Sequence, residues 1–518
     1  MSAEGRREGV VAASTGTEPM LGALRYGLWP WPLHDIVEFA ENALANRWIL
    51  PTVGVVDMSA GIDWDSTVDK AANSHRLWFH SLPFVHDLVE AYLATGEARY
   101  LAHAEHLFLD YLRWSGASEE ATAIAWSDEH AVANRCHVVI ALLFAALKRQ
   151  GEGDSDLWRI GRRHLRRHAE WLADDRHYVR SNRGTMMDRA LLSAALALGE
   201  EPCAAEWRET ALRRLGATFE VTFDADGCCS ENSPEYHQLN VELFRAVDEF
   251  LRDHGLTPPA DFAGRLERAE RFAGLFLRDD GVFPTIGDSQ AVLPRVPVKR
   301  HSGSAAFPTG GFAVLDGGEL TLTVKCGGTS FVHRHIDDGS ITLRHAGRDF
   351  IVDGGLYHYD NGDPVRRWLV SYRSHSGFYV EEAANVRFAN FPDARALGRI
   401  RDFRDEGDRC TVAMEVTHVP GVRIEREVEV RQPDTVVIVD RLAADRPVKW
   451  RQQFLLHPDC TVAIAGGRAI VTNGGATLEI DQSGASPAVA VETGHYSPRF
   501  LEVLPAKCLV FTGEGDTV

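Results

Sequence analysis

Two histidines and nearby acidic residues form the segment of the chain most suggestive of chemistry. His333 and His335 are separated by one residue, and Asp337 follows at the same spacing. On a strand both histidines would point to the same side, whereas in a turn they can diverge into separate roles. Asp353 and His375 follow further along. Two histidines and a carboxylate suit a zinc ion with an open or a structural fourth position, although these residue types are also common in turns that hold no metal.

A tyrosine and an asparagine stand where two predicted helices begin. Tyr236 lies beside His237, immediately before the apolar pattern of 239–250. A tyrosine in this place can transfer a proton, or it can pack as an aromatic side chain beside a helix cap. Asn182 precedes another apolar helix, where asparagine is ordinarily a cap or turn residue. The residues alone leave both alternatives open.

The chain up to about residue 290, which contains Asn182 and Tyr236, is predicted to form helices. Apolar residues from Val85 to Leu93 recur at the spacing of one helical face. After a short break the same period returns over 101–112, which predicts an antiparallel helix pair. Successive pairs of this kind are typical of a solenoid or a closed toroid. Similar patterns occur over 138–148, 158–173, 189–199, 205–216 and 241–253.

After about residue 300 the hydrophobic period changes to two, which predicts strands. Val422, Ile424, Val428 and Val430 alternate with polar residues, and Asn473-Gly474 is typical of a hairpin turn. Many short strands joined by Gly and Asp turns indicate a β-sandwich. The predicted fold is therefore an α+β multidomain chain with an N-terminal (α/α) toroid followed by a C-terminal antiparallel β-sandwich. The predicted divisions are a disordered tail 1–20, a toroid 21–295 and a sandwich 296–518.

Composition limits the classes of partner. The chain has 518 residues, 45% of them hydrophobic and 25% charged, as in ordinary globular proteins of more than one domain. Its longest apolar run, Val138 to Leu147, is about half of what a bilayer requires, so no membrane association is expected. The formal charge of −19 argues against nucleic acid and makes a long polyanion an awkward substrate without a local basic cleft. A homo-oligomer is compatible with these features.

The N-terminus and the cysteines favour a cytoplasmic location. Residues 1–20 are polar and lack the apolar region of a secretory signal, so secretion would require that a signal has been removed. The eight cysteines are scattered, and the adjacent Cys228 and Cys229 fit buried thiols better than a disulfide framework.

Taken together, the segments resemble the heparinase II/III superfamily of polysaccharide lyases, which includes heparin, heparan sulfate and alginate lyases. The most specific part is His333-x-His335-x-Asp337 followed by the Val-Asp-Gly-Gly turn at 352–355, where Gly354 replaces the more usual proline. The resemblance implies that His333 is the catalytic histidine. It also implies a bound Zn²⁺, mainly structural, with the ligands His335, Asp353 and His375.

The same resemblance assigns further residues around a substrate. The segment Glu231-x-Ser233-x-x-Tyr236 matches the one that carries the family's catalytic tyrosine, and Asn182 matches the asparagine that binds the uronate carboxylate. Where many members have a histidine, this chain has Arg183, which is always protonated and cannot act as a base. Tyr236 or His333 would then accept the proton in place of that histidine. The residues expected to contact the substrate are His130, Arg135, Glu231 and His237.

The implied activity is β-elimination in poly- or oligosaccharides that contain uronic acid. Such a site must neutralise a carboxylate, supply a base and protonate the leaving oxygen. A tyrosine could serve as acid, base or both if cationic neighbours lower its pKa. Two alternatives remain: an intracellular tailoring or biosynthetic enzyme acting on a small molecule that bears a uronate, and a non-catalytic protein that binds carbohydrate.

Overall fold

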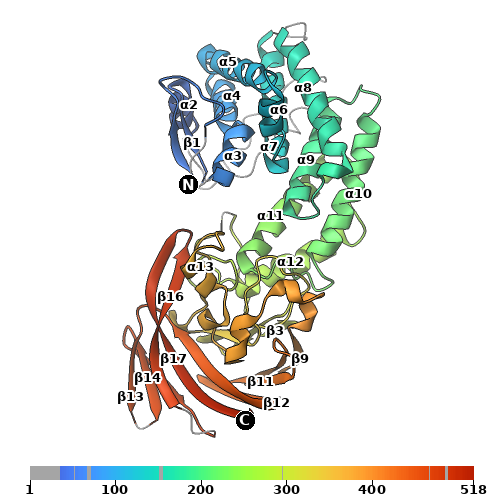
Figure 1. The fold of residues 1–518 in the computed structure, drawn as a ribbon. Coiled ribbons are helices and arrows are strands. Elements are labelled where there is room, and N and C mark those ends of the chain that lie inside the picture. The colour runs from blue at the N-terminus through green and yellow to red at the C-terminus, as the bar shows by residue number, and fades with distance from the viewer. Residues whose placement is uncertain are drawn as a thin grey trace. The chain divides into compact units, whose positions relative to one another are not determined.

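The structure, a computed structural model, describes residues 35–51, 53–66, 72–150, 156–294, 296–465, 467–484 and 488–518. The predicted tail 1–20 lies outside these residues. The chain divides into two compact units (Figure 1). The first is mainly helical and contains the chain up to Phe219 together with Leu243–Ala260. The second contains Glu220–Glu242 and Asp261–Val518, and with them the β-structure that follows residue 300.

The first unit contains the antiparallel helices that the apolar periods predicted. Its most buried helix is α7, in which all residues from Ala131 to Ala146 are buried. By length and composition α7 could cross a membrane, but 89% of its apolar window is buried inside the protein, as in a core helix. Its helices are α2 (Ile36–Leu44), α3 (Ala72–Ser81), α4 (Pro83–Thr95), α5 (Ala98–Ser115), α6 (Glu119–Ala125), α7 (Glu129–Gln150), α8 (Asp156–Ala173), η4 (Asp175–His177), α9 (Asn182–Ala197) and most of α10 (Ala204–Thr222).

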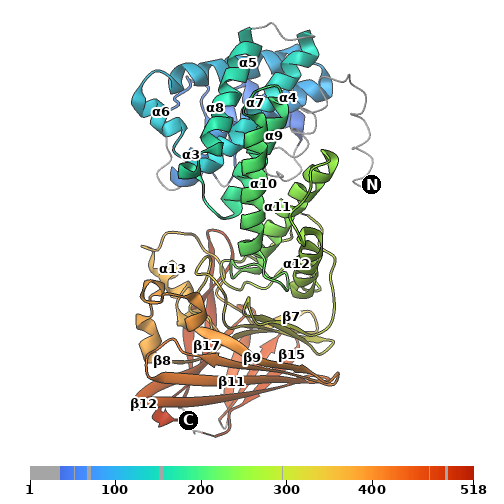
Figure 2. The same ribbon diagram turned by 90° about the vertical axis from the view of Figure 1, so that its right-hand side faces the viewer.

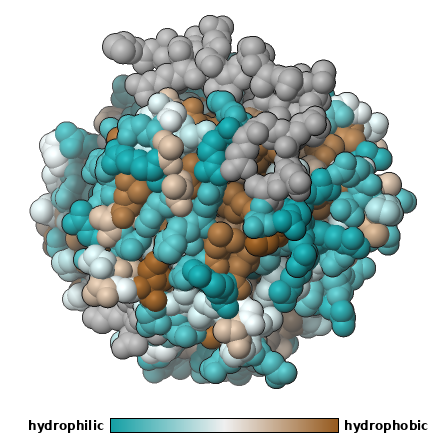
Figure 3. Space-filling view, turned by 90° about the horizontal axis from the view of Figure 1, so that it is seen from above, coloured by the Kyte–Doolittle hydropathy of each residue, from teal (hydrophilic) through white to brown (hydrophobic). Residues whose placement is uncertain are grey.

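A short hairpin that the helical periods did not predict also belongs to this unit. Its strands are β1 (Arg47–Leu50) and β2 (Gly54–Asp57). Trp48 on β1 is fully buried and stacks on Phe84 of α4, with ring centroids 3.8 Å apart. Seen from above, the surface shows separate hydrophobic patches among hydrophilic residues (Figure 3).

The second unit is built on antiparallel strands, as predicted. The long strand β12 pairs with β11 along its first half and with β17 along its second. On β11 the predicted alternation holds, because Val422, Ile424, Val428 and Val430 are buried in the main core of this unit. The strands are β3 (Ala305–Phe307), β4 (Phe312–Asp316), β5 (Leu320–Lys325), β6 (Ser340–His345), β7 (Arg348–Ile351), β8 (Phe378–Val380), β9 (Gly398–Asp405), β10 (Arg409–Val416), β11 (Val422–Arg431), β12 (Thr435–Leu456), β13 (Thr461–Ala465), β14 (Arg468–Asn473), β15 (Ala476–Asp481), β16 (Ala488–Arg499) and β17 (Glu502–Thr517).

The strands form one large sheet and one small sheet. The large sheet runs in the order β3-β4-β5-β6-β7-β12-β11-β10-β9, with β8, β16 and β17 attached through β12 and β17. The small sheet is β13-β14-β15, and Asn473-Gly474 forms its predicted hairpin turn. The second unit also contains helices, of which α11 belongs to it only up to Glu242. They are α11 (Pro234–Asp253), α12 (Phe262–Phe276), α13 (Pro364–Leu369), η5 (Tyr372–Ser374), η6 (Glu381–Asn385), η7 (Phe388–Asn390) and η8 (Ala394–Ala396).

The division differs from the boundary predicted at 295/296, because α12 packs with the sheet. Phe272 of α12 meets Phe307 of β3 edge to face, with ring centroids 4.7 Å apart. Phe276 meets Phe312 of β4 in the same way, at 5.6 Å. These four rings lie in one buried cluster, and Figure 2 shows α12 above the strands. A helical period reports which face of a helix is buried and does not report what covers that face.

Candidate active site

A tyrosine and a histidine stack on each other in the second unit. Tyr236 is the third residue of α11, and His333 lies in the turn that precedes β6. Their ring centroids are 3.5 Å apart and the ring planes differ by 15°. The segment around His333 is a turn and not a strand, and His333 itself has a left-handed φ of 55°. A non-glycine residue rarely adopts this conformation, which costs free energy and is common at functional sites.

His333 lies between two carboxylates. Its Nδ1 is 3.0 Å from Oδ2 of Asp288, a hydrogen-bond distance. Its Nε2 is 3.5 Å from Oε2 of Glu231. The other oxygen of Glu231 accepts a hydrogen bond from Asn240 at 3.1 Å. Because a carboxylate only accepts, the contact with Asp288 keeps a proton on Nδ1 and leaves Nε2 of a neutral ring as the atom that can accept a proton.

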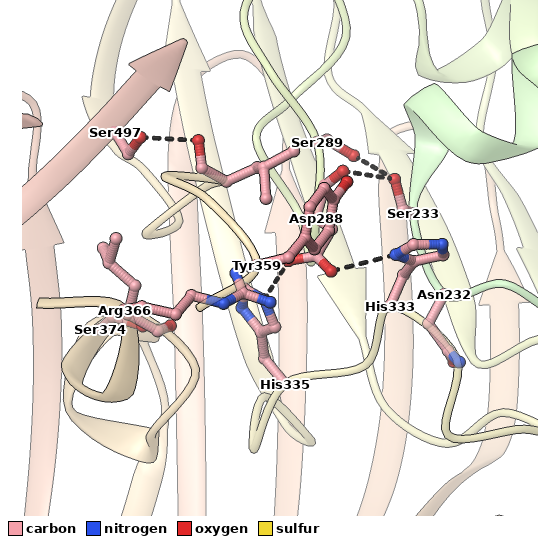
Figure 4. A network of polar contacts seen from close by, with 12 residues as sticks. Asn232, Ser233, Asp288, Ser289, His333, His335, Tyr359, Arg366, Ser374 and Ser497 are labelled. Atoms are coloured by element: carbon pink, nitrogen blue, oxygen red, sulfur yellow. Dashed lines mark hydrogen bonds and ion pairs between the residues drawn. The ribbon is translucent and has the colours of Figure 1, made fainter. Parts of the chain in front are cut away.

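Asp288 connects the predicted catalytic histidine to the predicted metal ligands (Figure 4). Its Oδ1 is 2.9 Å from Nε2 of His335 and accepts a hydrogen bond from Nη1 of Arg366 at 2.6 Å. Burial alone would raise the pKa of Asp288, but hydrogen bonds from His333 and His335 and the charges of His335 and Arg366 hold it well below its usual value. Asp288 therefore stays ionised.

Asp288 was not among the predicted site residues. It lies shortly before the boundary predicted at 295/296, in a stretch rich in Gly, Pro and Ser. One signal was present in the preceding residue. Gly287 has a φ of 59°, and a Cβ atom there would lie 2.5 Å from the carbonyl oxygen of Asn232 and 2.9 Å from that of His333. Only glycine permits this close approach, which brings Asp288 to the two histidines.

A second tyrosine, which was not predicted from the sequence, contacts Tyr236. The hydroxyl groups of Tyr236 and Tyr359 are 2.5 Å apart, and Tyr359 lies in the loop between β7 and α13. Burial raises the pKa of Tyr236, and the charges of Asp288, Glu235 and Glu231 raise it further. The condition under which Tyr236 could act as a base, a pKa lowered by cationic neighbours, is therefore not met in the structure. A tyrosine of this kind is protonated at neutral pH and suits the donation of a proton.

The three predicted metal ligands lie together and are fully buried. One ligand atom from each of His335, Asp353 and His375 lies within 4.8 Å of the others. Nδ1 of His375 is 2.8 Å from Oδ2 of Asp353. Nδ1 of His335 and Oδ1 of Asp353 are buried without a hydrogen-bond partner among the described residues. Unsatisfied buried atoms of this kind are costly, and two imidazoles with one carboxylate match the donor atoms of zinc sites, so these residues fit a metal ion.

Asn182 and Arg183 lie in the first unit, where they begin α9. The Ser181 side chain caps this helix by accepting from the Arg183 amide, so Asn182 is its first residue and not its cap. The guanidinium of Arg183 is exposed and forms an ion pair with Glu129 at 2.8 Å. Their predicted partnership with Tyr236 and His333 of the second unit stays a prediction.

Two residues expected to contact a substrate have structural roles instead. Arg135 has no exposed surface and donates to the carbonyl oxygens of His80 and Ala125, at 2.6 and 2.8 Å. His237 is also buried, and its two ring nitrogens contact the Cys229 amide and the Ala269 carbonyl. Because both side chains are enclosed and bonded within the protein, the prediction that they contact a substrate is wrong.

His130 and Glu231 keep features that suit a site. Burial lowers the pKa of His130 to about 4, so its ring is neutral, and its Nε2 has no hydrogen-bond partner among the described residues. Burial raises the pKa of Glu231, and its Oε2 contacts His333 without forming a hydrogen bond. A role in substrate binding stays a prediction for both.

Comparisons with known proteins cover nearly the whole described chain. The model of the heparinase II/III N-terminus matches residues 36–309, and the model of the heparinase II/III-like C-terminal region matches residues 299–517. No curated protein matches. Among solved structures, a heparan sulfate lyase from Pedobacter heparinus has 18% identity and a TM-score of 0.74, covering 96% of this chain and 85% of that chain.

Two other solved structures are similar to the same extent. One structure of heparinase III has 16% identity and a TM-score of 0.73, covering 96% of this chain and 87% of that one. Another has 15% identity and a TM-score of 0.75, covering 95% and 84%. These likenesses confirm the predicted fold class, a helical toroid followed by an antiparallel β-sandwich.

Proposed function

The chain belongs to the heparinase II/III family of polysaccharide lyases, and we propose that it cleaves glycans that contain uronic acid by β-elimination. The observation that carries this proposal is the stacked pair of Tyr236 and His333, with Asp288 bonded to the histidine. The pair supplies one group that accepts a proton and one that donates a proton, in contact with each other. An unsulfated uronan suits an acidic protein better than a highly sulfated glycan, because the formal charge of the chain is −19.

β-Elimination breaks two bonds on neighbouring carbons of the uronate ring. The C5–H bond breaks, its electron pair forms the C4=C5 double bond, and the C4–O bond breaks. The intermediate resembles an enolate with two negative charges, so the carboxylate must be neutralised while the proton leaves. The leaving oxygen also needs a proton. No water is added, and the new end of the glycan is an unsaturated uronate.

His333 is assigned the removal of the C5 proton, and Tyr236 the protonation of the leaving oxygen. The contact of Nδ1 with Asp288 orients the imidazole and leaves Nε2 to accept the proton. The nearby carboxylate of Glu231 would then stabilise the positive ring, since Oε2 is 3.5 Å from Nε2. The high pKa of Tyr236 keeps its hydroxyl protonated until the oxygen leaves. The proton held by His333 returns to Tyr236 through solvent after the products depart.

Neutralisation of the substrate carboxylate is assigned to Asn182 and Arg183. Both residues stand in the first turn of α9, where the positive end of the helix dipole favours an anion. Arg183 adds a fixed positive charge, which its ion pair with Glu129 partly offsets. In this assignment Arg183 takes over the electrostatic part of the role of the family's histidine and leaves proton transfer to the second unit.

His335, Asp353 and His375 would hold a Zn²⁺ ion with a mainly structural role. A bound zinc would supply positive charge to their buried and unsatisfied ligand atoms. Asp288 contacts both His333 and His335, so it fixes the catalytic ring and a metal ligand together. The chain's own contribution is a rigid loop that holds Nε2 of His333 in place.

The test is a panel of unsulfated and sulfated uronans, with formation of the conjugated C4=C5 product followed by ultraviolet absorbance. The parent protein is expected to give a rising signal on at least one polymer. Tyr236→Phe is expected to lose at least about 100-fold in kcat, because general acid catalysis contributes about that much. The control is Tyr357→Phe. It removes a hydroxyl from the loop that carries Tyr359, but this hydroxyl is not part of the contact between Tyr236 and Tyr359. Equal activity of Tyr236→Phe and Tyr357→Phe would remove Tyr236 from the mechanism.

A further inference from the structure

Two exposed aromatic rings lie beside the stacked pair. Tyr359 is 49% exposed and Phe500 is 37% exposed. Their ring centroids are 6.2 Å apart with an angle of 39° between the planes. Isolated exposed apolar residues are common on protein surfaces and require no explanation. These two form a pair, however, and the hydroxyl of Tyr359 contacts that of Tyr236.

Phe500 stands at the tip of the hairpin formed by β16 and β17, and several bonds fix this tip. The amide of Phe500 donates to Oε1 of Gln290 at 2.8 Å. The amide of Leu501 donates to the carbonyl oxygen of Tyr357, also at 2.8 Å. Behind the tip, the hydroxyl of Ser497 contacts the carbonyl oxygen of Leu356 at 2.7 Å (Figure 4). The tip is therefore held against the loop that carries Tyr359.

The tip also adopts a strained conformation. Leu501 has a left-handed φ of 62°, although it is not a glycine, and its side chain is 63% exposed. Such a conformation costs of the order of 1 kcal/mol and persists only where the surroundings impose it. No burial of the Leu501 side chain compensates for this cost. The backbone bonds of Phe500 and Leu501 impose the conformation, and they keep the Phe500 ring at the surface.

A second route connects the tip to the catalytic tyrosine. Gln290, which accepts from the Phe500 amide, donates through its own amide to Oε2 of Glu235 at 2.8 Å. Its side-chain amide donates to Oε1 of Glu235 at 3.0 Å. Glu235 directly precedes Tyr236 on α11. The position of Phe500 is thus tied to Tyr236 through Gln290 as well as through Tyr359.

An exposed cation completes the tip. Arg499 precedes Phe500, is exposed, and forms no ion pair with a residue that the structure describes. Glu492 of β16, by contrast, is paired with Arg451 of β12 at 2.9 Å. Because Arg499 directly precedes Phe500 in the chain and is exposed, its guanidinium is available to a carboxylate or sulfate group of a sugar whose ring stacks on Phe500.

We propose that Tyr359, Phe500 and Arg499 form a sugar-binding subsite for the residue next to the uronate that loses its proton. The aromatic pair stacks on the face of that sugar, and Arg499 binds an acidic substituent on it. The ligand class is therefore a glycan with acidic groups on neighbouring sugars and not only at the cleaved position. The proposal rests on the proposed function, because it infers the position of this sugar from the contact between Tyr359 and the catalytic Tyr236.

The first test compares Phe500→Ala with the parent protein on long and short substrates. On hexasaccharides of glucuronate, mannuronate or hyaluronate, Phe500→Ala is expected to raise KM about tenfold with kcat within about twofold, since loss of stacking costs about 1.4 kcal/mol. The corresponding disaccharides also contain the sugar that fills this subsite, so Phe500→Ala should raise their KM to a similar extent. Phe500→Trp should restore the parent KM. The control is Val491→Ala, which removes another exposed apolar side chain of β16. Equal KM values for Phe500→Ala and Val491→Ala on every cleaved hexasaccharide would overturn the subsite.

Arg499→Ala tests the acidic substituent. It is expected to raise KM severalfold for a hexasaccharide with an acidic sugar on both sides of the cleaved bond. For hyaluronate, in which neutral sugars alternate with acidic ones, the effect should be smaller. An equal effect on both kinds of glycan would refute the role of Arg499.

Binding without turnover separates the subsite from the proposed function. Calorimetry is carried out with Tyr236→Phe and with Tyr236→Phe combined with Phe500→Ala, using the same hexasaccharides. Weaker binding by the double variant supports the subsite even if the parent protein gives no unsaturated product, in which case the lyase proposal alone fails. If product forms and both variants bind equally, the subsite fails and the lyase proposal stands.

Discussion

Replacing Asp288 by Asn tests how the candidate site is held together. The side chain of Asp288 is 3% exposed, and that of its partner Arg366 is 7% exposed. Oδ1 faces Arg366 and His335, and Oδ2 faces His333. Asparagine has the same shape but only one accepting oxygen. Whichever way its amide turns, one side of the site meets an N–H group where it needs an acceptor.

The size of the effect follows from the burial of Arg366. Removing one partner of a buried ion pair leaves the other charge without compensation and costs about 3–5 kcal/mol. Asparagine still accepts one hydrogen bond, so we expect about 3 kcal/mol, a large part of the stability of an ordinary domain. Asp280→Asn is the control. Asp280 pairs with Arg278, but its side chain is 38% exposed, and its loss should cost less than about 1 kcal/mol.

The assay is a double-mutant cycle of Asp288→Asn and Arg366→Met, measured by urea unfolding with excess zinc and again after chelation. If the cost comes from an unpaired Arg366, the double variant should be more stable than the sum of the single effects predicts, by about 2 kcal/mol. Strictly additive effects in both conditions would refute the reasoning. Asp288→Asn should also weaken zinc binding about 10- to 100-fold, because it contacts the ligand His335.

Three further predictions concern other parts of the chain. Chelation should lower the melting temperature of the parent protein, and zinc should restore it, while His375→Ala should show neither effect. Arg135→Met should destabilise the protein by about 3 kcal/mol, because two buried carbonyl groups lose their donor. The control Arg167→Met, at an exposed guanidinium that lies over the ring of Trp126, should cost less than about 1 kcal/mol in urea unfolding. Burial raises the pKa of Asp188 in the folded protein. Above about pH 4 the Asp188 carboxyl ionises in the unfolded chain but stays protonated in the folded protein, so the parent protein loses stability as the pH rises. Asp188→Asn should therefore gain in urea midpoint relative to the parent between about pH 3 and about pH 7, and a loss would contradict the assignment.

The residue types of the site were predictable, but its geometry was only partly so. His335, Asp353 and His375 were recognisable as a ligand set, and the structure brings them together. Whether His333 lay on a strand or in a turn could not be decided, because the choice depends on its φ of 55°. That conformation is imposed by contacts with distant parts of the chain, such as Gly287.

Asp288 and Tyr359 were missed because their importance comes from tertiary contacts. Each lies in a loop without a spacing that indicates function, and each meets its partners across many residues, 45 for Asp288 with His333 and 123 for Tyr359 with Tyr236. Conversely, Arg135 and His237 carried suitable chemistry in suitable segments, but their side chains bond to backbone groups in the interior. A sequence reports which groups are present and does not report which of them are enclosed.

The fold followed the same rule. The helical periods and the alternation on β11 were correct because each depends on which side of one element is buried. The hairpin of Arg47–Leu50 and Gly54–Asp57 was missed because strands of four residues are too short to show a period. The partner of α12 was also missed, because its phenylalanines suit a helical neighbour as well as a sheet.

The most direct test of β-elimination is the mass of the products formed in water enriched in oxygen-18. A uronan cleaved by the parent protein should give two fragments whose masses add up to that of the substrate, without added water and without the heavy isotope. The fragment with the new non-reducing end should also absorb ultraviolet light. Incorporation of one oxygen-18 atom per cleavage would identify a hydrolase and contradict the roles assigned to His333 and Tyr236.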